Sequence, residues 1–233
     1  MLSQNDIKYI NSLKIKKYRK KYAQFIAEGD KIIKELIVEG LEVVHIYTIN
    51  NVFSNANVTL VSEIQLNKIT ALQQHHHSLA IFKIPNTEFQ IKHDEWILLL
   101  DDIQDPGNMG TIIRTCDWFG VKKIICSDGC VDPWNTKVIQ ASMASIGRVQ
   151  VVEADIELII SQFPFPVYGA VLNGTNYRLQ TFNHKGFILI GNEGHGIRKE
   201  LLQKISYPIT IPRIGSAESL NAAIATALIL DKL

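Results

Sequence analysis

The sequence predicts an α/β protein whose C-terminal part is a mostly parallel sheet with helices on both faces, preceded by a smaller α/β domain. From residue 96 onward, short and fully apolar runs alternate with segments of helical periodicity. Unbroken apolar runs are typical of parallel strands, because the connecting helices bury both faces of the sheet. Hydrophobic residues make up 46% of the 233 residues and charged residues 20%, as in globular proteins with a packed core.

The first part of the chain reads as a compact α/β unit followed by a polar stretch. Apolar residues at positions 32, 33, 36 and 37 share one face of a helix, which Gly40 is suited to end in a left-handed conformation. Ser62 and Gln65 predict a capping box at the start of another helix. The polar residues 85–95 predict a short and fairly stiff linker, so we expect domains at 1–93 and 94–233. Strands are expected at 24–27, 43–49 and 79–84.

The second part continues the strand and helix alternation to the end of the chain. We expect strands at 96–100, 123–126, 149–152, 168–172, 187–190 and 209–211. The expected helices cover 107–119, 135–144, 156–160 and 219–230.

The net charge is only +1, but residues 8–21 hold seven cations and no acid. One interpretation is the solvated face of a helix, which is what most charge runs are. The other is contact with a phosphate backbone, in which Tyr18 and Tyr22 would stack on bases. The candidates for such contacts are Lys16, Lys17, Arg19, Lys20 and Lys21.

The chain lacks the marks of secretion, membrane insertion or metal binding. Its N-terminus has no basic and then apolar pattern, no run is long enough to span a membrane, and three cysteines cannot form a disulfide framework. We therefore expect a cytoplasmic protein. The histidines at positions 75–77 have no cysteine or acid near them in sequence, so we expect an exposed loop and no metal site.

Three apolar runs in the second part lead into loops of glycine, asparagine and acidic residues: 101–114, 190–197 and 211–223. In open α/β folds, ligands bind beyond the carboxyl ends of the strands. We therefore expect the three loops to form one composite site.

The first loop predicts a turn at 105–108 and a helix that carries Arg114 roughly one and a half turns beyond Asn108. A guanidinium in that place is suited to binding a phosphate through two hydrogen bonds. An exposed arginine on a helix that Asn108 caps accounts for the same residues equally well.

The other two loops are less specific when each is taken alone. The three glycines of 191–196 let the backbone approach a ligand, but their spacing is not the dinucleotide fingerprint, and no P-loop lysine follows. Ser219 is either a functional hydroxyl or the N-cap of the last helix. The alanines of that helix permit close approach of another subunit and fit a buried packing helix equally well.

Taken in this order, the three loops resemble the motifs of the SPOUT-class RNA ribose methyltransferases, in the TrmH/SpoU branch. The family's acid-Pro-x-Asn-x-Gly core and following arginine are matched by 105–110 and Arg114. Its Gly-x-Glu-Gly-x-Gly motif is matched by 191–196, and its Ile-Pro-x-x-Gly-x-x-x-Ser-Leu-Asn motif by 211–221. The chain departs at Arg213, where methionine is common, and at 222–223, where Val-Ser is usual. Residues 25–29, followed by an amphipathic helix, are similar to the family's N-terminal substrate-binding module.

The resemblance implies methylation of a ribose 2′-hydroxyl in ribosomal or transfer RNA, with S-adenosylmethionine as cofactor. It also implies a trefoil knot in the C-terminal domain and a homodimer through that domain, with the active site at the interface. Arg114, positioned by Asn108, would act on the target as a base, as a phosphate clamp or as both, although an arginine releases its proton only at high pH. Glu193, Ser219 and Asn221 would orient the substrate or hold the loops. The cofactor would be held at Leu172, Gly174, Gly191, Glu193, Gly194, Ile211 and Leu220.

Two other functions remain open at this point. One is a non-catalytic RNA-binding protein of the same fold. The joint presence of five residues disfavours it: Asn108, Arg114, Glu193, Ser219 and Asn221. The other is a nucleotide-dependent enzyme that binds phosphates at 191–196, which lacks the expected lysine or pair of metal-binding carboxylates.

Overall fold

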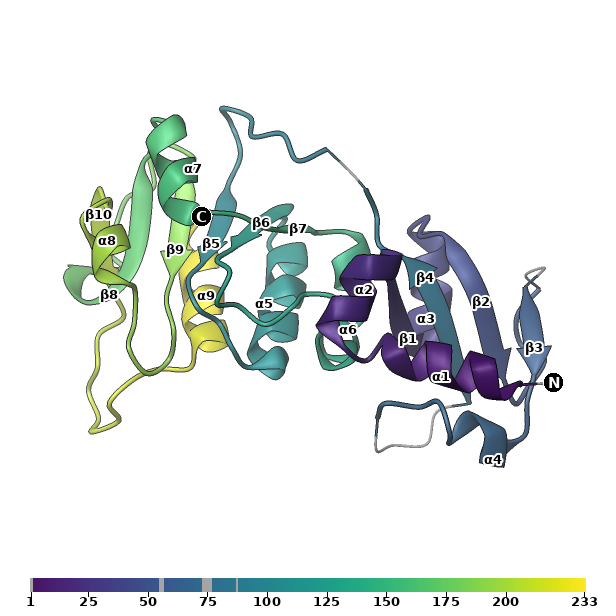
Figure 1. Cartoon of the computed structure of the whole chain (residues 1–233). Helices are drawn as coiled ribbons and strands as arrows, with labels where there is room; N and C mark the ends of the chain where they lie inside the picture. Colours follow the sequence, from purple (N-terminus) through teal and green to yellow (C-terminus); the bar gives the residue numbers. More distant parts are fainter. Residues whose placement is uncertain (1, 55–56, 73–76, 87) are drawn as a thin grey trace. The chain divides into compact units, whose positions relative to one another are not determined.

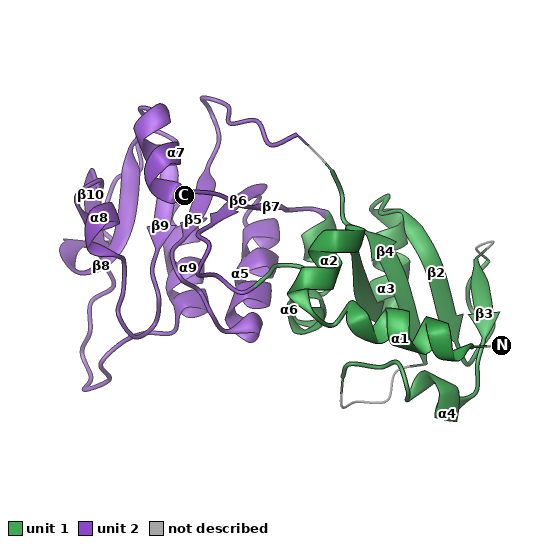
Figure 2. Cartoon of the chain, in the orientation of Figure 1, with its two compact units in different colours: residues 1–87, 132–147 green, residues 88–131, 148–233 purple. Residues whose placement is uncertain are grey.

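The computed structural model describes residues 2–54, 57–72, 77–86 and 88–233, so His75 and His76 lie outside the described part. The chain forms two compact units (Figure 2). Unit 1 comprises residues 1–87 and 132–147, and unit 2 comprises 88–131 and 148–233. The sequence predicted two continuous domains, 1–93 and 94–233, whereas each unit of the structure is made of two separate segments. The difference arises because a segment from the middle of the chain packs into unit 1.

Unit 1 is built on a four-stranded sheet in the order β1 (Gln24–Glu28), β4 (Ser78–Lys83), β2 (Val43–Thr48) and β3 (Val58–Leu60). Strand β4 is antiparallel to both of its neighbours, and β3 is parallel to β2. The helices described in this unit are α1 (Gln4–Ser12), α2 (Lys16–Tyr22), α3 (Asp30–Val38), α4 (Glu63–Leu66) and α6 (Thr136–Ser142). The capping box of Ser62 and Gln65 and the left-handed Gly40, with φ of 81°, are confirmed.

The two faces of the unit 1 sheet bury different sets of side chains. Ile26 on β1 belongs to a core with Ile10 and Leu13 from the N-terminal helical region. The neighbouring Phe25 points to the opposite face, as side chains alternate along a strand. There its ring lies 5.5 Å from that of Phe82 and 4.8 Å from that of Trp134. Trp134 precedes α6, so residues 132–147 complete a core begun by the N-terminal residues.

Unit 2 contains a six-stranded sheet in which each neighbouring pair of strands is parallel, as the sequence predicted (Figure 1). The strand order is β10-β8-β9-β5-β6-β7. The strands are β5 (Ile97–Leu100), β6 (Lys123–Cys126), β7 (Gln150–Glu153), β8 (Val167–Asn176), β9 (Phe187–Ile190) and β10 (Tyr207–Thr210).

Helices cover both faces of this sheet. Ile97 and Leu99 of β5 pack in a core that includes residues of α7 (Ile156–Gln162) and α8 (Lys199–Leu202). Leu98 and Leu100 alternate to the other face. The remaining helices, α5 (Pro106–Trp118) and α9 (Ala222–Leu230), pack against each other. No helix in the described ranges is both long and apolar enough to cross a membrane. The trefoil knot stays a prediction.

Candidate functional site

The site lies at the carboxyl edge of the unit 2 sheet, where β5 and β9 are neighbours and end side by side. The loops that follow these two strands are tied by a buried carboxylate. Asp101 is fully buried and accepts hydrogen bonds from the backbone N–H and the Nε of Arg198, at 2.8 and 2.7 Å. Asn192 adds a bond from its Nδ2 to the backbone oxygen of Asp102, at 2.8 Å. The strand order therefore brings the first and second loops together.

Asn108 joins all three loops. Its Nδ2 donates to Oε1 of Glu193 at 2.5 Å, and its Oδ1 accepts from Nδ2 of Asn221 at 2.8 Å. Oδ1 of Asn221 accepts hydrogen bonds from the backbone N–H groups of Ala223 and Ile224, which makes Asn221 the N-cap of α9. Residues 108, 193 and 221 therefore form one hydrogen-bonded cluster, called the Asn108 cluster below.

Capping does not explain Asn108 or Ser219. Asp105 is the N-cap of α5, and its carboxylate accepts from the backbone N–H of Asn108 at 2.8 Å. The side chain of Asn108 is thereby left for the cluster, and Ser219 precedes the true cap, Asn221, by two residues.

Arg114 lies on the exposed side of α5, and the structure records no hydrogen bond from it to the Asn108 cluster. The geometry thus unites three of the five expected catalytic residues. It places Arg114 on the same helix as Asn108, and Ser219 in the wall of the adjoining cavity.

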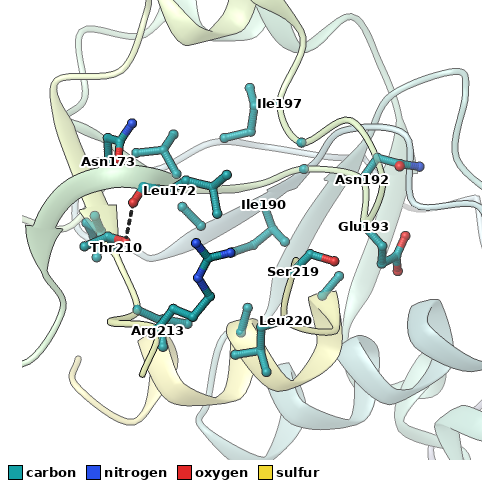
Figure 3. Close-up of a pocket in the computed structure, with 18 of the residues that line it drawn as sticks. Leu172, Asn173, Ile190, Asn192, Glu193, Ile197, Thr210, Arg213, Ser219 and Leu220 are labelled. Carbon is teal, nitrogen blue, oxygen red and sulfur yellow. Dashed lines mark hydrogen bonds between the residues drawn. The ribbon is translucent and has the colours of Figure 1, made fainter. Parts of the chain in front are cut away.

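The cavity beside the cluster has a volume of about 1000 Å³ (Figure 3). Its wall is formed by the middle of β8 (residues 170–173), the second loop, β10 and the third loop, together with residues of α8 and α9. Six of the seven residues expected to bind a cofactor line it: Leu172, Gly191, Glu193, Gly194, Ile211 and Leu220. The walls combine apolar side chains with the exposed backbone of a glycine loop, a combination typical of small-molecule sites.

Gly174 is the exception, because it does not line the cavity. A Cβ at this position would lie 2.5 Å from the backbone oxygen of Pro208, so Gly174 allows β8 and β10 to approach each other. Gly191 does line the cavity, but its need for glycine is also internal. A Cβ there would lie 2.4 Å from the carbonyl carbon of Gly196, across the bridge between Asn192 and Gly196. Both glycines are therefore required by the chain's own backbone.

The buried thiol of Cys130 supports the start of the first loop. Sγ of Cys130 accepts from the backbone N–H of Ile103 and donates to the backbone oxygen of Leu100, both at 3.2 Å. Hydrogen bonding between this thiol and that of Cys126, reinforced by burial, raises the pKa of Cys126. The same hydrogen bond lowers the pKa of Cys130. The thiol of Cys130 thus fixes the loop backbone between Asp101 and Asp105.

Comparison with known proteins identifies the family. Residues 95–231, more than half of the chain, match the SpoU rRNA methylase family. The chain belongs to the SpoU rRNA methylase family. The family membership predicted from the three loops is thereby confirmed. Residues 4–80 match an MRM3-like substrate binding domain.

Individual members of the family align over nearly the whole chain. The chain is 28% identical to the 23S rRNA (guanosine(2553)-2′-O)-methyltransferase RlmP of Bacillus subtilis, over 97% of this chain and 95% of that protein. A TrmH-family protein of Porphyromonas gingivalis has a similar structure, with 34% identity and a TM-score of 0.89, over 100% of this chain and 98% of that one. The AdoMet-bound rRNA methyltransferase of Sinorhizobium meliloti is 28% identical with a TM-score of 0.88, over 100% and 95%.

The basic segment of unit 1 is only partly exposed. Arg19 is 2% exposed, and its guanidinium pairs with Asp132 at 2.6 Å and donates to the backbone oxygen of Leu13. The expectation that Arg19 contacts RNA is therefore wrong, because the residue anchors segment 132–147 within unit 1. Lys16 is half-buried, whereas Lys17, Lys20 and Lys21 are exposed on α2. The rings of Tyr18 and Tyr22 stack on each other at 6.3 Å.

The residues that hold the loops in place were not predicted from the sequence. Asp101 and Arg198 lie 97 positions apart, and nothing in either segment predicts their pairing. Asp102 has φ of 60°, a left-handed conformation that is uncommon outside glycine, and its carboxylate meets Nε2 of His195 at 3.2 Å. The sequence feature that could have indicated a buried carboxylate is the pair of acids directly after a buried strand, because one of two consecutive side chains must point into the protein interior.

Proposed function

We propose that this protein transfers a methyl group from S-adenosylmethionine to the 2′-hydroxyl of a ribose in ribosomal or transfer RNA. The observation that carries the proposal is the Asn108 cluster, because it joins the three family motifs at the edge of one cavity. Two relatives support it: the Bacillus subtilis protein is named a 23S rRNA 2′-O-methyltransferase, and the Sinorhizobium meliloti enzyme is described with AdoMet bound.

The cavity suits the cofactor in size and chemistry. A volume of about 1000 Å³ has room for an adenosyl group and its amino-acid chain. Leu172 and Leu220 offer apolar contact for an adenine ring, and the backbone at Gly191 and Ile211 offers hydrogen bonds. When bound, the cofactor supplies an electrophilic methyl group.

The residues of the chain would prepare the ribose hydroxyl for reaction. A hydroxyl is a weak nucleophile until its proton is drawn away, and it must be held in line with the methyl group. Arg114 is positioned on α5, the helix that Asn108 anchors to the other loops. We assign to Arg114 the binding of the target's phosphate and 2′-oxygen, with proton removal as a further role. Glu193 and Asn221 hold Asn108, and Ser219 faces the substrate from the cavity wall.

Unit 1 would supply RNA affinity. It matches a substrate binding domain and carries Lys17, Lys20 and Lys21 on one exposed helix. Such lysines bind phosphates by releasing counterions, without reading sequence.

A homodimer through unit 2 is also part of the proposal. Helices α5 and α9 pack together and expose large apolar side chains, with Trp118 84% and Ile224 52% exposed. A second copy would cover such residues. We place the enzyme in the cytoplasm, where ribosomal and transfer RNA are found.

Two measurements test the function. Methyl transfer from labelled S-adenosylmethionine to total RNA should give label in ribose, and mapping of ribose methylation with and without the gene should identify the nucleotide. Thermal shift should show stabilisation by S-adenosylmethionine and by S-adenosylhomocysteine, because a ligand that binds the folded state raises its stability. ATP and NAD should give none. RNA binding without any cofactor stabilisation would refute catalysis and favour a non-catalytic RNA-binding protein.

A further inference from the structure

Arg213 brings a positive charge into the wall of the cavity. It follows Ile211 and Pro212 in the third loop, and Figure 3 shows its guanidinium pointing into the cavity toward Ile190. Nη1 donates to the backbone oxygen of Ala217 at 3.2 Å. Within the described part of the chain, no carboxylate forms an ion pair with it. Arg213 is exposed, and since a guanidinium has five N–H donors, the bond to Ala217 leaves most of them open to a ligand.

The other charged groups of the cavity wall do not neutralise this arginine. Glu193 is held by Asn108, and His195 meets Asp102. Glu218 is exposed in the same loop as Arg213 but forms no ion pair with it. A guanidinium beside apolar side chains favours an anion that presents two oxygens, because its planar fork pairs bidentately with carboxylates and with phosphates.

We propose that Arg213 binds the carboxylate of the cofactor's amino-acid chain and so makes this site selective for cofactors that retain that carboxylate. The inference rests on the proposed function. The adenosine part of S-adenosylmethionine is uncharged, and its sulfonium and amino groups are positive. The carboxylate is therefore the one group of the cofactor that complements Arg213. A phosphate of the RNA is the competing partner. It is disfavoured because the guanidinium points toward Ile190 in the cavity wall.

The test combines two ligands with three variants of the full chain. The ligands are S-adenosylhomocysteine and 5′-methylthioadenosine, which shares the adenosine and the thioether but has no amino-acid chain. Arg213→Met removes the charge and keeps an unbranched apolar chain, and Arg213→Lys keeps the charge without the planar fork. Lys199→Met is the matched control, because Lys199 is an exposed cation of the same unit that does not line the cavity. Calorimetry measures the dissociation constant of each ligand for the wild-type chain and for the three variants, which gives eight values.

Arg213→Met should raise the dissociation constant of S-adenosylhomocysteine about tenfold, as expected for loss of a charge-assisted hydrogen bond at a partly exposed site. The constant for 5′-methylthioadenosine should change by less than about twofold, which is the ordinary effect of a surface substitution. Arg213→Lys should fall between wild type and Arg213→Met, and Lys199→Met should match wild type with both ligands.

Three results would overturn the inference. Equal weakening of both ligands would place Arg213 against the adenosine, and no weakening of either would remove it from cofactor binding. Unchanged cofactor affinity with weaker RNA binding would assign it to an RNA phosphate. Binding of neither ligand by the wild-type chain would instead overturn the proposed function together with the inference, so the two failures are distinguishable.

Discussion

Asn108→Asp is the substitution that most directly tests the Asn108 cluster. It keeps the shape of the side chain but replaces the Nδ2 donor with an oxygen that faces Oε1 of Glu193, at the present 2.5 Å separation. The bond from Asn221 is retained, because the other oxygen still accepts it. One hydrogen bond is therefore exchanged for a contact between two carboxylates.

The size of the effect follows from this geometry. A hydrogen bond to a charged group contributes about 1.5–3 kcal/mol, and the partly exposed cluster places the loss near the middle of that range. On the order of 2 kcal/mol corresponds to a roughly 30-fold decrease in kcat/KM at neutral pH. Two carboxylates at this distance share a proton, so the pKa of one of them is raised. Protonation restores a donor, and the deficit relative to wild type should shrink as the pH falls through that raised pKa.

The assay is single-turnover methyl transfer by wild type and by Asn108→Asp, measured between about pH 5.5 and 8.5. The ratio of the two rates at each pH gives the deficit. Asn108→Ala should lose activity without any recovery at low pH. Asn183→Asp, an exposed asparagine of the same unit, controls for the added charge and should match wild type. A ratio of one at neutral pH would show that the cluster does not position the catalytic groups. A deficit that stays constant with pH would show that the two carboxylates do not share a proton.

Four further outcomes are expected. Arg114→Ala should lower kcat at least about 100-fold with unchanged affinity for S-adenosylhomocysteine, and near-normal turnover would contradict its assigned role. Gly191→Val should lower the free energy of unfolding of unit 2 by about 1–3 kcal/mol and weaken cofactor affinity in parallel, because the new Cβ meets Gly196. Thermal unfolding and calorimetry measure the two effects, and one effect without the other would contradict this reasoning. Deletion of residues 1–93 should give an aggregating protein, because segment 132–147 loses the core of unit 1; a soluble dimer with a cooperative melt would argue otherwise. Replacing Lys17, Lys20 and Lys21 together by glutamine should reduce the steepness of log affinity for RNA against log salt concentration by about 2–3. An unchanged slope would show that these lysines do not contact RNA phosphates.

The sequence by itself determined the features that depend on local periodicity and local hydrogen bonding. Unbroken apolar runs specified the parallel strands of unit 2, because burial on both faces requires them. Ser62 and Gln65 specified a capping box, because both partners lie within one helical turn. The three motif loops also followed from sequence, because each lies directly after a strand and carries its own pattern of glycine and polar residues.

The tertiary structure decided every feature that depends on partners far apart in the chain. Arg19 looked like one more exposed cation, and only the arrival of Asp132, 113 residues later, makes it a buried anchor. Asn108 meets Asn221 across the same separation, because the strand order places the first and third loops at one edge of the sheet. The sequence assigns Gly191 to close approach of a ligand, whereas in the structure the backbone at Gly196 is what excludes a side chain. Local patterns encode burial and capping, whereas the identity of a distant partner is fixed only when the strands have been ordered and packed.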